Sequence, residues 1–282
     1  ARFREFPAWR KTFYDESAAQ GAAFISIAAE NPDLFSDVDP KRLTEAEQTA
    51  GKALQGYRAR LMSNQNTWCV VSVPTPAWAC KVFPHETEET AVARLWTEIL
   101  RAVRVSEESD PVAAWKEHVS ALQKTADFLN AHDFLELHYR NGLGTDLHVE
   151  LPKGHIWMGG AERAASGTMF VANIPTEEVY TLPKRDGVNG VVVASKPLHY
   201  NGNLIAGFSL TFRAGKVTDY HAESGEEHLR ELLQTDEGAS FLGEVALVPH
   251  ASPISASGIL FYNTLFDENA SCHLALGKAY PT

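Results

Sequence analysis

The sequence is poor in the features that mark the specialised classes of protein. Its 282 residues contain only three cysteines, Cys69, Cys80 and Cys272, whose odd number and unpaired spacing exclude a disulfide-stapled scaffold and indicate reduced thiols. The longest apolar stretches, such as residues 191–194, fall far short of the ~20 residues that a membrane-spanning helix needs. Residues 1–20 show no basic segment followed by an apolar one, so no signal peptide is visible, although a trimmed chain would look the same. These absences predict a cytoplasmic protein without a membrane partner.

Positive charge is also scarce. Lysine and arginine together number 25 against 36 aspartates and glutamates, which gives a formal net charge of -11. No block of basic residues concentrates the positive charge that is present. A chain with this balance repels a phosphate backbone, so nucleic acid is a poor partner.

What remains is the composition of an ordinary globular chain, with 44% apolar and 22% charged residues. Apolar residues recur at three- and four-residue steps over 92–103 and again over 112–129, where Asp110 can cap the helix and Pro111 can occupy its first position. After His132 the pattern changes to short strands and tight turns. We therefore expect α/β and α+β domains: an N-terminal α/β domain with connecting helices over 1–120, and a mixed, strand-rich domain over 121–282, divided between about Ser106 and Asp133.

Two local patterns in the second half carry definite structural predictions. Residues 191–198 and 204–212 flank the turn sequence at 200–203, and the Asn201-Gly202 pair tolerates the positive φ values of a β-hairpin turn. Ser224 and Glu227 have the spacing of a capping box, which predicts a helix running to Leu233.

The short motifs of the common hydrolases and nucleotide-binding proteins are absent. The sequence has no His-Glu-x-x-His, no Gly-x-Ser-x-Gly, no phosphate-binding loop with lysine and no Cys-x-x-Cys. Several acidic and imidazole groups nevertheless stand beside apolar runs, namely Glu177, Glu178, Glu244, Glu268 and His273. A carboxylate in dry surroundings is costly unless it is paired or binds a cation, so convergence of these groups would indicate a metal site. On spacing alone, the interpretation of each group as a strand-end charge that reaches solvent is favoured over a metal site.

Four strings carry a resemblance to a known family. They are Asn-Ile-Pro-Thr-Glu-Glu-Val-Tyr at 173–180, Lys-Pro-Leu-His-Tyr-Asn-Gly-Asn at 196–203, Leu-Gly-Glu-Val-Ala-Leu-Val-Pro at 242–249 and the long string that begins with Phe-Tyr-Asn-Thr at 261–280. In this order they resemble the aminopeptidase T / aminopeptidase S family of metallo-aminopeptidases. A weaker likeness passes through residues 138–147 and the helix of Trp115 back to about Tyr14, so the resemblance covers most of the chain.

The resemblance implies a set of site residues. The family's metal-binding glutamate falls on Glu178, or on Glu177 if the order of the pair is reversed, and the glutamate that bridges two metal ions falls on Glu244. Glu268 and His273 match further ligands, although Glu268 could instead support a ligand. Tyr280 matches the catalytic tyrosine. Cys272, between these positions, is expected to be a small buried thiol and not a ligand.

The resemblance also implies an activity. Peptides with a free N-terminus would lose their first residue to a water activated by two divalent ions, of zinc, cobalt, manganese or magnesium, in a homodimeric enzyme. Glu177 is a weak candidate for the acidic partner of the substrate amine.

The match departs from the family at the ends of the chain. Family members begin earlier than Ala1 and continue past Tyr280 to a His-x-Asp pair that completes the metal centre. We therefore expect either a fragment or a chain with an incomplete site that binds one ion weakly or none, without peptidase activity. Two alternatives stay open: a metal-independent hydrolase with a pair of carboxylates, and a non-catalytic scaffold or dimerisation fragment.

Overall fold

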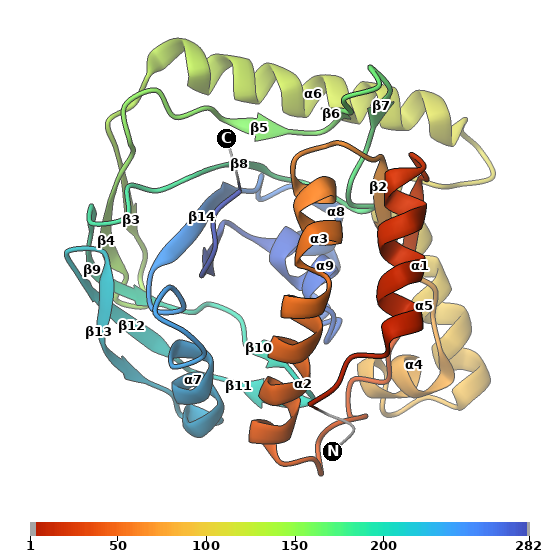
Figure 1. Cartoon of the computed structure of the whole chain (residues 1–282), viewed down its shortest axis with the longest axis horizontal. Coiled ribbons are helices and arrows are strands. Elements are labelled where there is room, and N and C mark those ends of the chain that lie inside the picture. The colour runs from red at the N-terminus through yellow and green to blue at the C-terminus, as the bar shows by residue number, and fades with distance from the viewer. Residues whose placement is uncertain (1–3, 281–282) are drawn as a thin grey trace.

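The computed structural model describes residues 4–280, which fold as a mixed α/β chain with several small sheets (Figure 1). The expected mixture of helices and strands is confirmed. No helix in the described part of the chain is long and apolar enough to cross a membrane. The helices are α1 (Ala8–Ala19), α2 (Pro40–Ala53), α3 (Gln55–Met62), α4 (Pro76–Val82), α5 (Glu88–Ala102), α6 (Pro111–His132), α7 (Glu226–Leu233), α8 (Pro253–Ser257), α9 (Thr264–Asp267) and the 3₁₀ turn η1 (Glu268–Ala270).

Helices α1 to α5 alternate along the chain with the two strands of a small parallel sheet, β1 (Phe24–Ile27) and β2 (Trp68–Val71). This sheet is joined to the second half of the chain, because Val70 pairs with Asn173 in a parallel bridge. The Val70 amide donates to the Ala172 carbonyl at 2.8 Å, and the Ile174 amide donates to the Val70 carbonyl at 2.9 Å. The N-terminal part of the chain thereby holds the segment that leads into Glu178.

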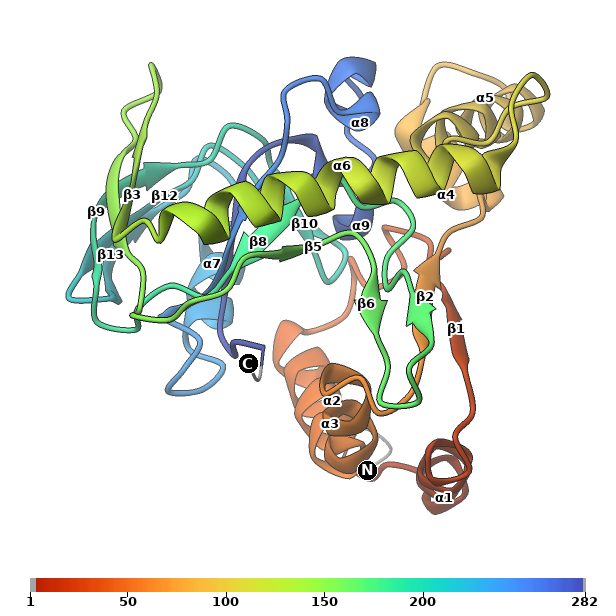
Figure 2. The ribbon, with the colours of Figure 1, turned by 90° about the horizontal axis from the view of Figure 1, so that it is seen from above.

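Helix α6 spans the molecule from the helical part to the strand-rich part (Figure 2). It begins as the sequence predicts, because the Asp110 carboxylate accepts from the Val112 amide at 2.9 Å and Pro111 follows the cap. It ends at Asp133, whose φ of 45° lies in the left-handed region. The buried residues of the predicted stripe, Leu122 and Ala126 among them, belong to the main hydrophobic core.

The larger sheet is antiparallel throughout and has the strand order β13-β12-β9-β4-β3. One of its faces supplies the main core with side chains such as Leu147, Val149 and Phe212, which are almost fully buried. Its strands are β3 (Glu136–Arg140), β4 (Asp146–Glu150), β9 (Val188–Val193), β12 (Ser209–Arg213) and β13 (Lys216–His221), and separate two-stranded ribbons are formed by β6 (Glu162–Arg163) with β7 (Met169–Phe170) and by β10 (Leu198–Tyr200) with β11 (Asn203–Ile205).

The smaller sheet carries the residues of interest. Its order is β15-β14-β8-β5, all antiparallel, and its strands are β5 (Met158–Gly159), β8 (Val179–Thr181), β14 (Leu242–Leu247) and β15 (His273–Leu276). Strand β8 packs beneath α6, and Val179 and Val245 are buried in the main core.

A second hydrophobic core joins the two ends of the chain. Helices α4 and α5 contribute Trp78 and Leu95, and the segment 254–270 contributes Phe261 and Phe266. The Trp78 indole N–H donates to the Phe261 carbonyl at 2.5 Å. This core crosses the boundary that we expect between Ser106 and Asp133, because helices α4 and α5 of the expected first domain pack against residues 254–270 of the expected second domain.

Two local predictions need correction. The Asn201-Gly202 turn does form, with φ values of 50° and 80°, but it joins only the short strands β10 and β11, while β9 pairs with β12 in the larger sheet. Ser224 does not cap α7. Its backbone is engaged in a bridge with Ala206, and the helix begins after Gly225 without a side-chain cap.

The close approach of β14 and β15 generates a prediction about Gly243. A Cβ at this position would lie 2.6 Å from the Gly277 carbonyl oxygen and 2.9 Å from the Lys278 carbonyl carbon, and backbone atoms cannot yield cheaply. We expect Gly243→Ala to lower the free energy of unfolding by roughly 1–3 kcal/mol. Gly56→Ala, in exposed helix α3 with open space around its Cβ, is the control and should raise it by up to ~1 kcal/mol. Urea titration of both variants measures this, and equal stability of the two would contradict it.

Candidate metal centre

Strand alternation places the side chains of Glu178, Glu244 and His273 on one face of the smaller sheet, together with that of Tyr180. Tyr180 of β8 and His273 of β15 both stand opposite Ala246 of β14, and directly paired residues share a face. Because side chains alternate along a strand, Glu244 lies on the same face as Ala246, and Glu178 on the same face as Tyr180. The opposite face is apolar and contributes to the main core. The sheet therefore separates a hydrophobic side from an acidic one.

The three groups meet at short range. The Nε2 atom of His273 lies 2.8 Å from Oε2 of Glu178 and 3.8 Å from Oε1 of Glu244. One ligand atom from each of the three residues lies within 4.8 Å of the others. Glu178 is buried, and the other two side chains are largely shielded from solvent. This spacing is suited to a cation that is bound by all three.

The orientation of His273 is set by the backbone. Its Nδ1 atom lies 3.1 Å from the Ser271 carbonyl oxygen, which can only accept a hydrogen bond. In the neutral ring Nδ1 therefore carries the proton, and the lone pair of Nε2 points at the Glu178 carboxylate. A carbonyl partner of this kind is typical of histidines that bind metal ions through their other nitrogen.

Two buried polar atoms at the centre have no hydrogen-bond partner. They are Oε2 of Glu178 and Nε2 of His273, which lie 2.8 Å apart and form an ion pair only when the ring is protonated. Two acceptors at this distance repel each other unless a proton or a cation lies between them. The donor set of carboxylate oxygens and one imidazole nitrogen suits a divalent ion, and the residues therefore fit the metal that the sequence predicts.

The pKa values of Glu244 and His273 are shifted because these residues are buried close to one another and to Glu178. Burial raises the pKa of Glu244 to about 7, and the neighbouring charge of Glu178 contributes to the shift. Burial by itself lowers the pKa of His273, but the contact with Glu178 outweighs this effect and raises the pKa to about 9. Without a metal ion the cluster therefore takes up protons.

A cavity of about 200 Å³ opens in front of the cluster. Glu268, which begins η1, lines this cavity, and burial together with the charge of Glu178 raises its pKa to about 8. Glu268 does not belong to the three-residue cluster that meets within 4.8 Å. None of the described residues that line the cavity is lysine or arginine; they are Gly159, Gly160, Glu162, Ala172, Asn173, Thr176, Glu178, Tyr180, Glu244, Glu268 and Tyr280.

Tyr280 lies in the cavity wall, where its ring is 5.6 Å from that of Tyr180. Burial raises the pKa of Tyr280, and the charges of nearby carboxylates, Glu162 first among them, raise it further. The phenol therefore stays protonated at neutral pH. It can donate a hydrogen bond to an oxygen that gains negative charge.

Glu177 points to a different part of the structure from Glu178. Its carboxylate pairs with both terminal nitrogens of Arg104, at 2.6 and 2.8 Å, and its amide donates to the Asn269 side chain. It does not line the cavity.

Cys272 is also placed differently from the expected buried thiol, because it precedes the first residue of β15 and is exposed.

Glu162 is a cavity residue that the sequence did not single out. It lies in the β6–β7 ribbon, and its Oε2 atom accepts from the Asn64 side chain at 2.7 Å. The Asn64 carbonyl accepts from the Ala165 amide of the same ribbon, so the N-terminal part positions this carboxylate. Its two-residue strand has no periodicity that could have indicated the role.

Comparison with known proteins gives a consistent result. The model of the thermophilic metalloprotease (M29) family matches residues 1–282. Aminopeptidase 2 of Geobacillus stearothermophilus is 55% identical, and aminopeptidase AmpS of Bacillus subtilis (strain 168) is 51% identical; each alignment covers 99% of this chain and 67% of the relative. The solved structure of wild-type AmpT from Thermus thermophilus superposes with a TM-score of 0.91 at 41% identity, over 99% of this chain and 68% of that one. The chain thus spans about two thirds of the length of these relatives.

The raised pKa of Glu268 predicts how the metal-free protein responds to pH. A carboxyl group whose folded pKa of about 8 exceeds its ordinary 4.5 contributes stability below pH 4.5, which is lost as the pH rises through 8. In EDTA, Glu268→Gln should therefore be more stable than the parent at pH 8, by roughly 4 kcal/mol, and the difference should vanish near pH 4. Urea titrations at both pH values test this, and a variant less stable than the parent at pH 8 would contradict it.

Proposed function

This chain belongs to the thermophilic metalloprotease (M29) family, and we propose that it acts as a metal-dependent aminopeptidase that releases N-terminal residues from peptides. The observation that carries the proposal is the convergence of Glu178, Glu244 and His273 beside one cavity, which Glu178 and Glu244 line, with two buried ligand atoms that have no hydrogen-bond partner. The names of the relatives, which are aminopeptidases, supply the class of substrate.

In the proposed reaction each side chain has a defined part. Glu178 and His273 would hold a divalent ion, Glu244 would be shared between this ion and a second one, and Glu268 would either bind the second ion or support its ligands. A divalent ion bound here would polarise the scissile carbonyl and lower the pKa of a water molecule toward ~7. Oxygen and imidazole donors admit zinc, cobalt, manganese or magnesium.

Tyr280 stabilises the charge that develops during the reaction. Its protonated hydroxyl faces the same cavity as the carboxylates and donates to the oxygen of the tetrahedral transition state. This contact strengthens only as the oxygen becomes negative, so it lowers the barrier more than it favours substrate binding.

Glu162 replaces Glu177 as the partner of the substrate amine in this proposal. Glu177 is neutralised by Arg104, whereas Glu162 lines the cavity and has one oxygen fixed by Asn64. A free α-ammonium group would pair with this carboxylate, and a blocked N-terminus would leave it without a partner. The geometry thus accounts for a preference for free N-termini.

We propose two further properties. The resemblance to the family implies a homodimer, and the three free thiols suit a cytoplasmic location. Neither affects the reasoning about the cavity.

The decisive experiment combines metal removal with one substitution. In the full-length protein, Glu244→Gln keeps the volume of the side chain but removes the charge shared between the ions, so we expect turnover of leucyl-anilide to fall at least about 10³-fold with loss of bound metal. EDTA should abolish turnover by the parent, and added zinc or cobalt should restore it. Glu227→Gln, on exposed α7, is the matched control and should behave as the parent.

The same measurements separate the alternatives. Turnover of a nitrophenyl-glycoside that survives EDTA would favour a carboxylate-pair hydrolase. Unchanged metal content in Glu244→Gln would remove Glu244 from the site. A protein that binds metal at the cluster but turns over neither substrate would favour a scaffold.

The role of Glu162 gives a separate prediction. Glu162→Gln should raise KM for leucyl-anilide by roughly 10- to 100-fold, because a charge-assisted hydrogen bond to the amine is lost, and should change kcat by only a few fold. Metal content should match that of the parent, since Glu162 is not a ligand. An unchanged KM would assign amine binding to another group.

A further inference from the structure

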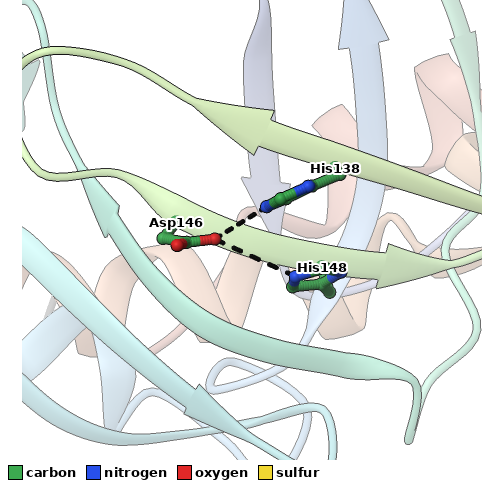
Figure 3. A group of neighbouring side chains, drawn as sticks. All are labelled: His138, Asp146 and His148. Carbon is green, nitrogen blue, oxygen red and sulfur yellow. Dashed lines mark hydrogen bonds and ion pairs between the residues drawn. The ribbon is translucent and has the colours of Figure 1, made fainter.

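A second cluster of metal-binding side chains lies on the larger sheet. His138 of β3 stands directly opposite His148 of β4, and Asp146 belongs to the same face of β4 by alternation. The other face of the two strands carries Leu147 and Val149 into the main core, so the three polar side chains project outward (Figure 3). One ligand atom from each lies within 4.8 Å of the others.

The contacts within this cluster are specific. The His138 Nε2 atom lies 2.7 Å from Oδ1 of Asp146, and the His148 Nε2 atom lies 3.9 Å from the same oxygen. The two imidazole rings stack with their centroids 3.9 Å apart. Both Nε2 atoms therefore face one carboxylate oxygen, as Figure 3 shows.

A fourth residue fixes the ring of His148. Its Nδ1 atom lies 2.7 Å from Oε1 of Glu136, and an ionised carboxylate can only accept, so the neutral ring is protonated at Nδ1. The lone pair of Nε2 then points toward the Asp146 oxygen, which is also an acceptor. A carboxylate–histidine pair of this kind orients imidazole ligands in metal sites.

We propose that His138, Asp146 and His148 bind one divalent transition-metal ion of the zinc class, with Glu136 as the positioning residue. Two imidazole nitrogens and one carboxylate, without sulfur, favour zinc, copper or nickel over magnesium or calcium. Exposure of the cluster leaves room for water to complete the coordination. The site is independent of the proposed peptidase function, because its ligands belong to the five-stranded sheet and those of the cavity to the four-stranded one.

The position of the cluster indicates what binding would do. Strand β3 is the edge of its sheet and is held only by β4 on one side. An ion shared by His138 and by residues of β4 would clamp the edge strand to its neighbour. Its effect would be local stabilisation of the β3–β4 hairpin, not catalysis.

The test is a zinc titration that is monitored by calorimetry and by NMR of the imidazole nitrogens. The parent protein should bind one more zinc ion than the His138→Gln/His148→Gln double variant, and the Nε2 resonances of both histidines should shift as that ion binds. Glu136→Gln should weaken this site by on the order of tenfold, since it removes only the orienting carboxylate. Amide exchange of residues 136–140 should slow with zinc in the parent and not in the double variant.

A matched control and a second variant keep the result unambiguous. His221 is a surface histidine that pairs with Glu226 outside the cluster, and His221→Gln should bind zinc as the parent does. If the double variant does not fold, Asp146→Asn should show the same loss of one ion. Equal zinc stoichiometry and affinity in the parent and in a folded cluster variant would overturn the proposal, as would imidazole resonances that do not move.

Discussion

The contact between Glu178 and His273 is the constraint on which the rest of the cavity depends. Two buried ligand atoms face each other at 2.8 Å, close enough that a proton or a cation must lie between them, and neither has another hydrogen-bond partner. Such an arrangement is unfavourable in a dry interior without positive charge between the atoms. Burial, and after it the charge of Glu178, raises the pKa values of Glu244 and Glu268, and the contact with Glu178 raises the pKa of His273, so the cluster takes up protons from water when no cation is bound.

The neighbouring glutamates of the 173–180 string show how the fold directs charge. Glu177 is met by the planar guanidinium of Arg104, and its amide is held by Asn269, whose own side chain also donates to Leu265. These bonds anchor the turn that precedes β8. Glu177 is fixed and neutralised by Arg104 on one side of the chain. Strand alternation turns Glu178 to the opposite side, toward the cavity, whose described lining residues include no arginine or lysine. One string thus supplies an anchor and a candidate ligand.

The sequence was informative where local rules decide the structure. Helix α6 begins at the predicted cap, and the mixed fold and the family resemblance are confirmed, whereas the domain boundary and the site roles stay predictions. Pairings distant in the chain were not predictable in the same way. The backbone of Ser224 is taken by Ala206, which removes the expected cap, and Glu162 reaches the cavity only because a ribbon without periodicity is held by Asn64. Resemblance indicated residues along the chain, but their convergence on one sheet face depends on the register of β8, β14 and β15.

The two metal-binding clusters differ chiefly in their exposure to water, and this difference decides how each is coupled to the fold. The His138 cluster is exposed, so its ligands are hydrated and partnered without an ion, and its integrity does not require one. Glu178 and its neighbours are removed from water, so part of the free energy of folding is spent on holding acceptors together. An ion that binds them recovers this cost, and binding is then coupled to the stability of the whole sheet. A purely structural role would not account for the cost of the buried cluster, and this cost is the physical reason why we propose it, and not the exposed cluster, as the catalytic site.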